Sequence, residues 1–82
     1  MKANIYIKYK DGILDPQGTT VCHALKTMKI NHVESLTIGK FVEMYFGNIS
    51  KKEAEAIADE SCRKLLANPN IETYKFEIVD TK

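Results

Sequence analysis

The chain has 82 residues, of which 12 are basic and 11 acidic, so its formal net charge is only +1. This length predicts a single domain over residues 1–82, near the lower limit for folding without disulfide or metal support. A hydrophobic content of 44% argues against intrinsic disorder. Because the charges are balanced, the chain has no broad positive electrostatic field that would attract nucleic acid or anionic lipid. No secretory signal or membrane-spanning apolar run is visible. We therefore expect a cytoplasmic protein that begins near Met1 and binds neither nucleic acid nor membrane.

The first predicted element is a strand near the N-terminus. Apolar residues at positions 3, 5, 7 and 9 alternate with the residues at positions 4, 6, 8 and 10. This period of two is typical of a half-buried strand. Tyr6 lies on the side opposite the isoleucines, and Asp11-Gly12 predicts a turn after the strand.

The segment Ile13–Val21 connects this strand to a predicted helix, and the rest of the chain is organised around it. Asp15 can accept hydrogen bonds from the free amides of a first helical turn, and Pro16 suits the next position because no amide hydrogen is needed there. Gln17 and Gly18 follow. A glycine inside a helix costs about 1 kcal/mol relative to alanine. Since Gly18 shares the apolar stripe of the helix, it predicts tight packing of helix on sheet.

Two helices are predicted. The first should run from about Pro16 to Met28 or Lys29. The second begins after Ser50, which forms a capping box with Glu53, and Asn68-Pro69 ends it because the residue before a proline avoids the helical region. The inward faces should consist of Val21, Ala24, Leu25 and Met28 in the first helix and of Ala54, Ile57, Ala58, Ser61, Cys62 and Leu65 in the second.

Between the helices, residues 33–46 are rich in strand-forming side chains. Gly39 interrupts the run, so the segment is either one long strand with a bulge or two shorter strands joined at a tight bend. Its alternating inward residues are Val42, Met44 and Phe46, and its outward residues are Phe41, Glu43 and Tyr45. A last strand contains Ile71, Tyr74, Phe76 and Ile78, and residues 80–82 form a polar tail.

This order predicts an α+β protein with a small antiparallel sheet of three to four strands and two helices on one face. The arrangement, β-α-β(β)-α-β, is close to half of a ferredoxin-like fold. Tyr6, Phe41 and Tyr45 lie opposite the core-facing residues of their strands. Because a cluster of aromatic side chains mixed with charge favours association, we expect a dimer with these residues in its contacts.

Candidate catalytic and metal-binding residues do not form a recognisable constellation. Cys22, His23, His32 and Cys62 lack the close pair spacing of zinc sites, and no spacing selects a base for a nucleophile. We expect no cofactor and no metal on this chain. Lys40, directly after Gly39, could bind an anion or contact a partner, although a solvated lysine is the more common case.

Four segments together resemble the PurS subunit of phosphoribosylformylglycinamidine synthase. They are Leu14-Asp15-Pro16-Gln17-Gly18, Val21 with His23-Ala24-Leu25, Ile38-Gly39-Lys40, and Lys64-Leu65-Leu66-Ala67-Asn68-Pro69. They occur in the family's order and at matching spacing, across nearly the whole chain. The sequence departs from the family pattern at Thr37, where an arginine is frequent, and over residues 29–31, where a glycine follows the first helix.

The resemblance implies a non-catalytic accessory subunit of de novo purine biosynthesis, on the pathway to IMP. Such a subunit would bridge a glutaminase, PurQ, and an ATP- and magnesium-dependent synthetase, PurL, and assist the transfer of ammonia between them. It also implies a homodimer or tetramer without activity of its own. The alternative from another class is a small dimeric domain that senses a metabolite. An RNA-binding sheet is excluded, since its aromatic-and-glycine motif is missing and the charge is too low.

Overall fold

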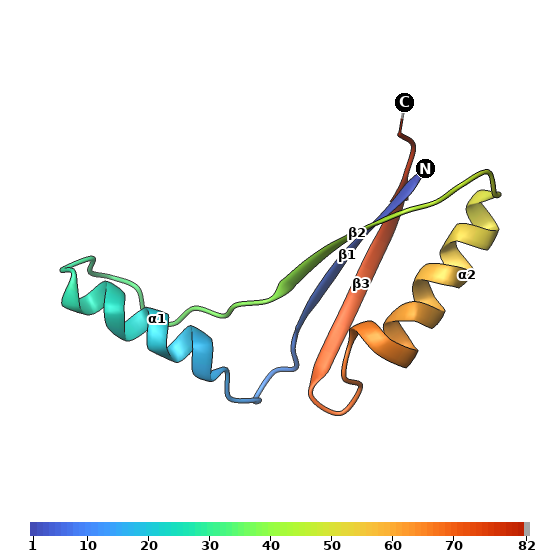
Figure 1. Ribbon diagram of the computed structural model, residues 1–82. Helices are drawn as coiled ribbons and strands as arrows, with labels where there is room; N and C mark the ends of the chain where they lie inside the picture. The colour runs from blue at the N-terminus through green and yellow to red at the C-terminus, as the bar shows by residue number, and fades with distance from the viewer. Residues whose placement is uncertain (82) are drawn as a thin grey trace.

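The computed structural model describes residues 1–81, which form a three-stranded sheet with one packed helix and one projecting helix (Figure 1). In chain order the elements are β1 (Lys2–Tyr9), α1 (Pro16–Thr27), β2 (Lys40–Tyr45), α2 (Lys51–Ser61), a π-helical turn η1 (Cys62–Leu66) and β3 (Glu72–Val79). The predicted α+β class and element order are confirmed. The end of the predicted polar tail, Lys82, lies outside the described residues. Within those residues, no helix is long and apolar enough to cross a membrane.

The central strand of the sheet is β1, and it pairs antiparallel with β2 on one side and β3 on the other. Ile5 of β1 lies between Val42 of β2 and Phe76 of β3. Because successive side chains of a strand point to opposite faces, this register collects the apolar residues on one face. The alternation predicted for the first strand is confirmed, since Ala3, Ile5 and Ile7 are all buried. We call this buried side of the sheet the inner face and the opposite side the outer face.

Small side chains bring α2 close to the inner face of the sheet. Ala54, Ala58 and Cys62 are fully buried and lie one helical turn apart along the contact line. The predicted capping box is confirmed: Ser50 Oγ accepts a hydrogen bond from the Glu53 amide, and Glu53 Oε1 accepts one from the Ser50 amide. Two residues predicted to face the core, Ile57 and Leu65, are instead exposed, because they lie beside the line of small residues.

The end of α2 is tied to β3 by side-chain hydrogen bonds. Tyr74 Oη donates to Asp59 Oδ1 at 2.7 Å, and Arg63 Nε donates to Asp59 Oδ2 at 2.9 Å. These two bonds hold the pKa of Asp59 below its usual value. The π-helical turn then ends as Ala67 adopts an extended conformation, ahead of the predicted stop at Pro69.

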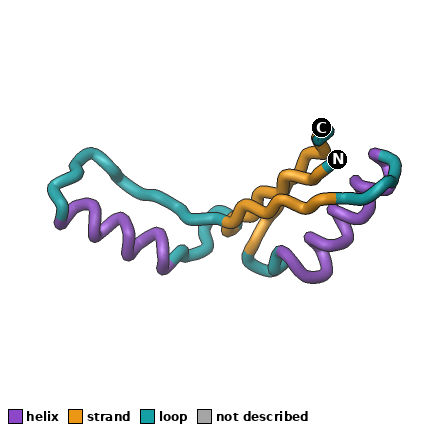
Figure 2. Tube along the Cα trace, turned by 45° about the horizontal axis from the view of Figure 1, so that its top comes forward, coloured by secondary structure: helices purple, strands orange, loops and turns teal. Residues whose placement is uncertain are grey.

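The first helix does not cover the sheet, and this corrects the prediction that both helices lie on one face. Instead, α1 and residues 28–39 run side by side away from the sheet (Figures 1 and 2). We call residues 13–39 the arm. The radius of gyration is 16.3 Å, whereas a compact chain of this length would have about 12 Å. The physical reason is local: the buried residues of α1 are Gly18 and Cys22, and the helix packs on the returning part of its own arm.

The prediction of strand structure from residue 33 is also wrong, since β2 begins only at Lys40. The pairing of β1 with β2 ends where Ile7 meets Lys40, and the last residues of β1 pair with β3 alone. Residues 33–39 therefore leave the sheet at this point, and no strand of the described chain pairs with them. Neither form of the predicted longer strand is present within one chain.

Candidate interaction site

Asp15 closes the base of the arm. The residue is 7% exposed, and each carboxylate oxygen accepts one backbone hydrogen bond. Oδ1 accepts from the Gly18 amide at 2.9 Å, and Oδ2 accepts from the Ile38 amide at 2.8 Å. The first bond is the predicted helix cap, with Pro16 and Gln17 in the first turn. The second joins the start of α1 to the end of the returning segment, 23 residues later.

These hydrogen bonds also set the ionisation of Asp15. They hold the pKa of its carboxyl below the usual value of 3.8, the bond from Gly18 contributing most and that from Ile38 next, while burial acts in the opposite direction. The ionised carboxylate, which can accept on both oxygens, is therefore the form that the closed arm requires.

Gly18 allows the two halves of the arm to approach each other. A Cβ atom at this position would lie 2.6 Å from Asp15 Oδ2 and 2.7 Å from the carbonyl oxygen of Leu36. The predicted tight packing at Gly18 is present, but the prediction that the helix packs there on the sheet is wrong. The partner of Gly18 is the returning segment of the arm.

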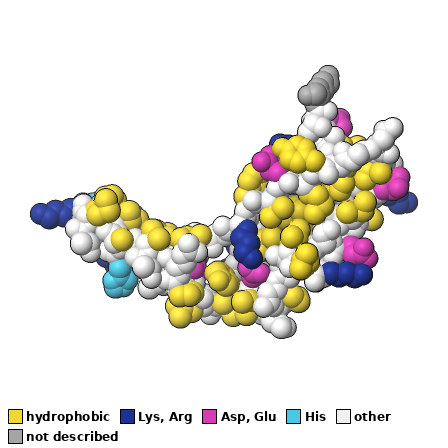
Figure 3. Space-filling model, in the orientation of Figure 1, with side chains coloured by type: hydrophobic (Ala, Val, Ile, Leu, Met, Phe, Trp, Pro, Cys, Tyr) yellow, Lys and Arg dark blue, Asp and Glu magenta, His cyan; other side chains and the backbone are white. Residues whose placement is uncertain are grey.

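The arm carries apolar side chains that no other described residue covers. Leu14 is 74% exposed and Met28 is 69% exposed, and Val21 and Ile30 are exposed as well. The predicted inward face of the first helix is therefore largely solvent-facing in a single chain. In Figure 3 hydrophobic side chains follow the arm and continue over the sheet. An apolar surface of this extent is typical of an interaction site.

A second uncovered surface lies on the outer face of the sheet. Tyr6 on β1 and Phe41 on β2 are cross-strand partners, and their ring centroids are 5.2 Å apart. Tyr45 is 66% exposed at the far end of β2, with the ammonium of Lys2 5.7 Å from its ring centroid. We call Tyr6, Phe41 and Tyr45 the aromatic patch. Large aromatic side chains beside charged ones are enriched at protein interfaces.

The Gly39-Lys40 pair has structural roles that the sequence did not reveal. A Cβ atom on Gly39 would lie 2.5 Å from the carbonyl oxygen of Ile7, so only glycine fits where the arm crosses the edge of β1. The Lys40 ammonium lies 3.7 Å from Glu72 Oε2, and its side chain is largely exposed. Glycine at a strand edge is a recognised signal of close backbone approach, but it does not identify the partner strand.

The histidines and cysteines of the chain are not brought together. His23 and His32 are exposed, whereas Cys22 and Cys62 are buried as free thiols in separate parts of the fold. Burial raises the pKa of the Cys62 thiol, which disfavours a nucleophilic thiolate there. Residues 1–81 contain no group of three or more metal-ligating side chains placed to hold an ion.

A small α+β chain whose conspicuous surfaces are an uncovered arm and an aromatic sheet face has the features of a subunit that binds other protein chains. The family model described as PurS, phosphoribosylformylglycinamidine (FGAM) synthase, matches residues 2–80. The chain belongs to the PurS family.

Individual relatives agree with this assignment. The PurS subunit of Bacillus subtilis FGAM synthase is 40% identical over 77 residues, covering 94% of this chain and 90% of the relative. The crystal structure of Methanocaldococcus jannaschii PurS superposes with a TM-score of 0.87 at 31% identity, covering 99% of this chain and 98% of that one. A chain in the structure of PurLQS from Thermotoga maritima gives a TM-score of 0.82 at 30% identity, with 93% of both chains covered. These matches favour the synthase subunit over the metabolite-sensing alternative.

Proposed function

We propose that this chain is the small, non-catalytic subunit of an FGAM synthase complex in de novo purine biosynthesis. The match to the PurS family over residues 2–80 carries this proposal. The likeness to a chain of PurLQS from T. maritima supports assembly with two other subunits. The scattered positions of the histidines and cysteines agree with a chain that has no turnover of its own.

In this role the chain bridges the glutaminase subunit PurQ and the synthetase subunit PurL in the cytoplasm. PurQ releases ammonia from glutamine, and PurL uses it with ATP and magnesium to convert formylglycinamide ribonucleotide to formylglycinamidine ribonucleotide. Free ammonia is protonated and dispersed in water, and an enclosed route between the subunits prevents this loss, as closed sites exclude side reactions with solvent. The contribution of this chain is to hold the partners so that such a route exists.

The chain performs this role as a homodimer in which the arm of each copy lies against the other copy. Within one chain, the apolar side of the arm and the aromatic patch are both exposed. A two-fold contact that places Met28 and Val21 of one arm against the β2 edge of the second copy's sheet would cover the arm together with Phe41 and Tyr45, and would leave Tyr6 accessible. Isologous two-fold contacts of this kind are the most common in homo-oligomers.

Gel filtration with light scattering tests both the dimer and the assembly. At micromolar concentration the purified chain should have at least twice its own mass, and it should co-elute with PurQ and PurL when the three are mixed. Met28→Asp should shift the isolated protein towards the monomer, because it places a charge on the apolar side of the arm. Ile57→Asp, at an exposed apolar residue of α2, is the matched control and should leave the mass unchanged. A monomeric parent protein would refute the dimer, and separate elution from both partners would refute the assembly.

A further inference from the structure

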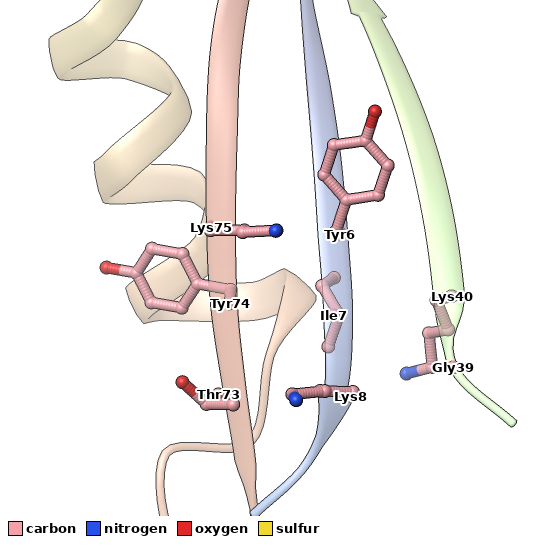
Figure 4. A pocket seen from close by; sticks show the side chains of 8 residues that line it. All are labelled: Tyr6, Ile7, Lys8, Gly39, Lys40, Thr73, Tyr74 and Lys75. Atoms are coloured by element: carbon pink, nitrogen blue, oxygen red, sulfur yellow. The ribbon is translucent and has the colours of Figure 1, made fainter. Parts of the chain in front are cut away.

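The outer face of the sheet contains a hollow at the end nearest the arm. It has a volume of about 390 Å³, and its lining includes Tyr6 and Lys8 of β1, Thr73 and Lys75 of β3, and Gly39 directly before β2 (Figure 4). The register pairs Tyr6 with Lys75 and Lys8 with Thr73, so these four side chains share the face away from α2. One chain supplies the whole lining, so the site does not depend on the proposed assembly.

Two lysines of this hollow form no ion pair with the described residues. Lys8 and Lys75 are diagonal neighbours on adjacent strands, and the Cα atoms of such neighbours are typically about 7–8 Å apart. Within residues 1–81, neither forms an ion pair with a carboxylate. Lys40 also lines the hollow, but it lies at the register position of Ile7, and its ammonium is paired with Glu72.

The other end of the outer face is balanced in charge. There Lys2 Nζ lies 2.7 Å from Glu43 Oε2, and Asn4 Nδ2 donates to Glu77 Oε1 at 3.4 Å. Positive charge without a partner is therefore concentrated at the hollow rather than spread over the sheet. An anion bound between Lys8 and Lys75 would offset the repulsion between these two like charges.

Aromatic contacts hold the wall of the hollow in place. The Lys75 ammonium lies 5.7 Å from the centroid of the Tyr6 ring, and the Tyr6 ring packs against Phe41. Thr73 adds a hydroxyl group to the lining, whereas the Tyr6 hydroxyl points away from both ammonium groups (Figure 4). The hollow thus combines a positively charged end with a flat, partly apolar wall.

We propose that this hollow binds the phosphate group of a small phosphate monoester. A phosphate monoester carries a charge of about −1.5 to −2 near neutral pH, which matches the two unpaired ammonium groups. Lysine binds phosphate as a compact point charge and needs no planar fork geometry. The volume exceeds that of a bare phosphate ion, and the Tyr6 ring offers a surface to the sugar of a ligand such as ribose 5-phosphate.

Titration of the ¹⁵N-labelled full chain with ribose 5-phosphate at low ionic strength, followed by NMR, tests this site. Amide shifts should be concentrated at residues 6–8, 39–40 and 73–75. The double variant Lys8→Gln with Lys75→Gln should raise the Kd at least fivefold. Lys52→Gln, an exposed lysine of α2, is the matched control and should change the Kd less than twofold.

Two further ligands distinguish binding of a phosphate monoester from binding of free phosphate or of the sugar alone. Inorganic phosphate should bind at the same residues but at least threefold more weakly than ribose 5-phosphate, and ribose should cause no shifts. Shifts spread over all exposed lysines, or a double variant that binds as tightly as the parent, would overturn the site. Equal affinity for inorganic phosphate and ribose 5-phosphate would overturn the assignment to a monoester. An altered oligomeric mass in the double variant would also overturn it, since the lysines would then act between subunits.

Discussion

Gly18→Ala should lower the melting temperature by roughly 5–10 °C, although alanine is the better helix former. In an open helix the substitution would stabilise by about 1 kcal/mol. Here the added Cβ would lie 2.7 Å from the Leu36 carbonyl oxygen and 2.6 Å from Asp15 Oδ2, so the returning segment of the arm must move. Overpacking of this kind costs about 1–3 kcal/mol, which exceeds the gain in helix propensity. Thermal unfolding followed by circular dichroism measures the difference.

Gly47→Ala is the matched control for this experiment. Gly47 is exposed, and a Cβ atom there would have no other heavy atom within 4 Å. The control variant should therefore melt close to the parent, as surface substitutions usually do. If Gly18→Ala melts at or above the temperature of Gly47→Ala, the close contact between α1 and residue 36 is not part of the folded protein.

The second large effect is expected at Asp15. Asp15→Ala removes both hydrogen bonds at the base of the arm and should lower the melting temperature by roughly 5–15 °C. Asp15→Asn distinguishes the contributions of the two hydrogen bonds to stability. Asparagine is about as good a helix cap as aspartate, but its side chain has only one acceptor oxygen. It should therefore keep the bond to Gly18 and lose that to Ile38, with a smaller fall in melting temperature.

The effect of Asp15 should depend on pH in a defined direction. Its folded pKa lies below the unfolded value of about 3.8, so its stabilisation is fully present above that pH. It is lost as the pH falls through the lower folded pKa, where the native carboxylate becomes protonated. The difference in melting temperature between the parent and Asp15→Asn should be constant near neutral pH and shrink below about pH 4. A difference that grows on acidification would contradict the assigned hydrogen bonds. Asp59 titrates in both proteins, and its contribution cancels in the comparison.

Local signals in the sequence were sufficient for the elements and their caps. The alternation of Ala3, Ile5 and Ile7 identified the buried face of β1 because a strand has only two faces. Ser50 with Glu53, and Asp15 before Pro16, marked both helix starts because capping needs only neighbouring residues. These predictions depend on interactions within a few positions of the chain.

The arm could not be predicted, because periodicity shows which side of a helix is apolar but not which surface covers it. Val21 and Met28 have the spacing of a core stripe, yet they are exposed in this chain. The bond from Ile38 to Asp15 spans 23 positions, and no local pattern reports it. Gly39 interrupts the run of strand-forming residues in the sequence, but its contact with the Ile7 carbonyl oxygen depends on where the arm leaves the sheet.

The proposed bridging role is tested most directly by reconstituting FGAM synthesis from separate PurL and PurQ with and without this chain. With glutamine as the nitrogen donor, synthesis should require this chain. With ammonium salts as the donor, PurL should proceed nearly as well without it, because no transfer between subunits is then needed. The chain alone should show no glutaminase, ATPase or synthetase turnover. Equal dependence on this chain with both nitrogen donors would contradict a role in bridging the subunits for ammonia transfer.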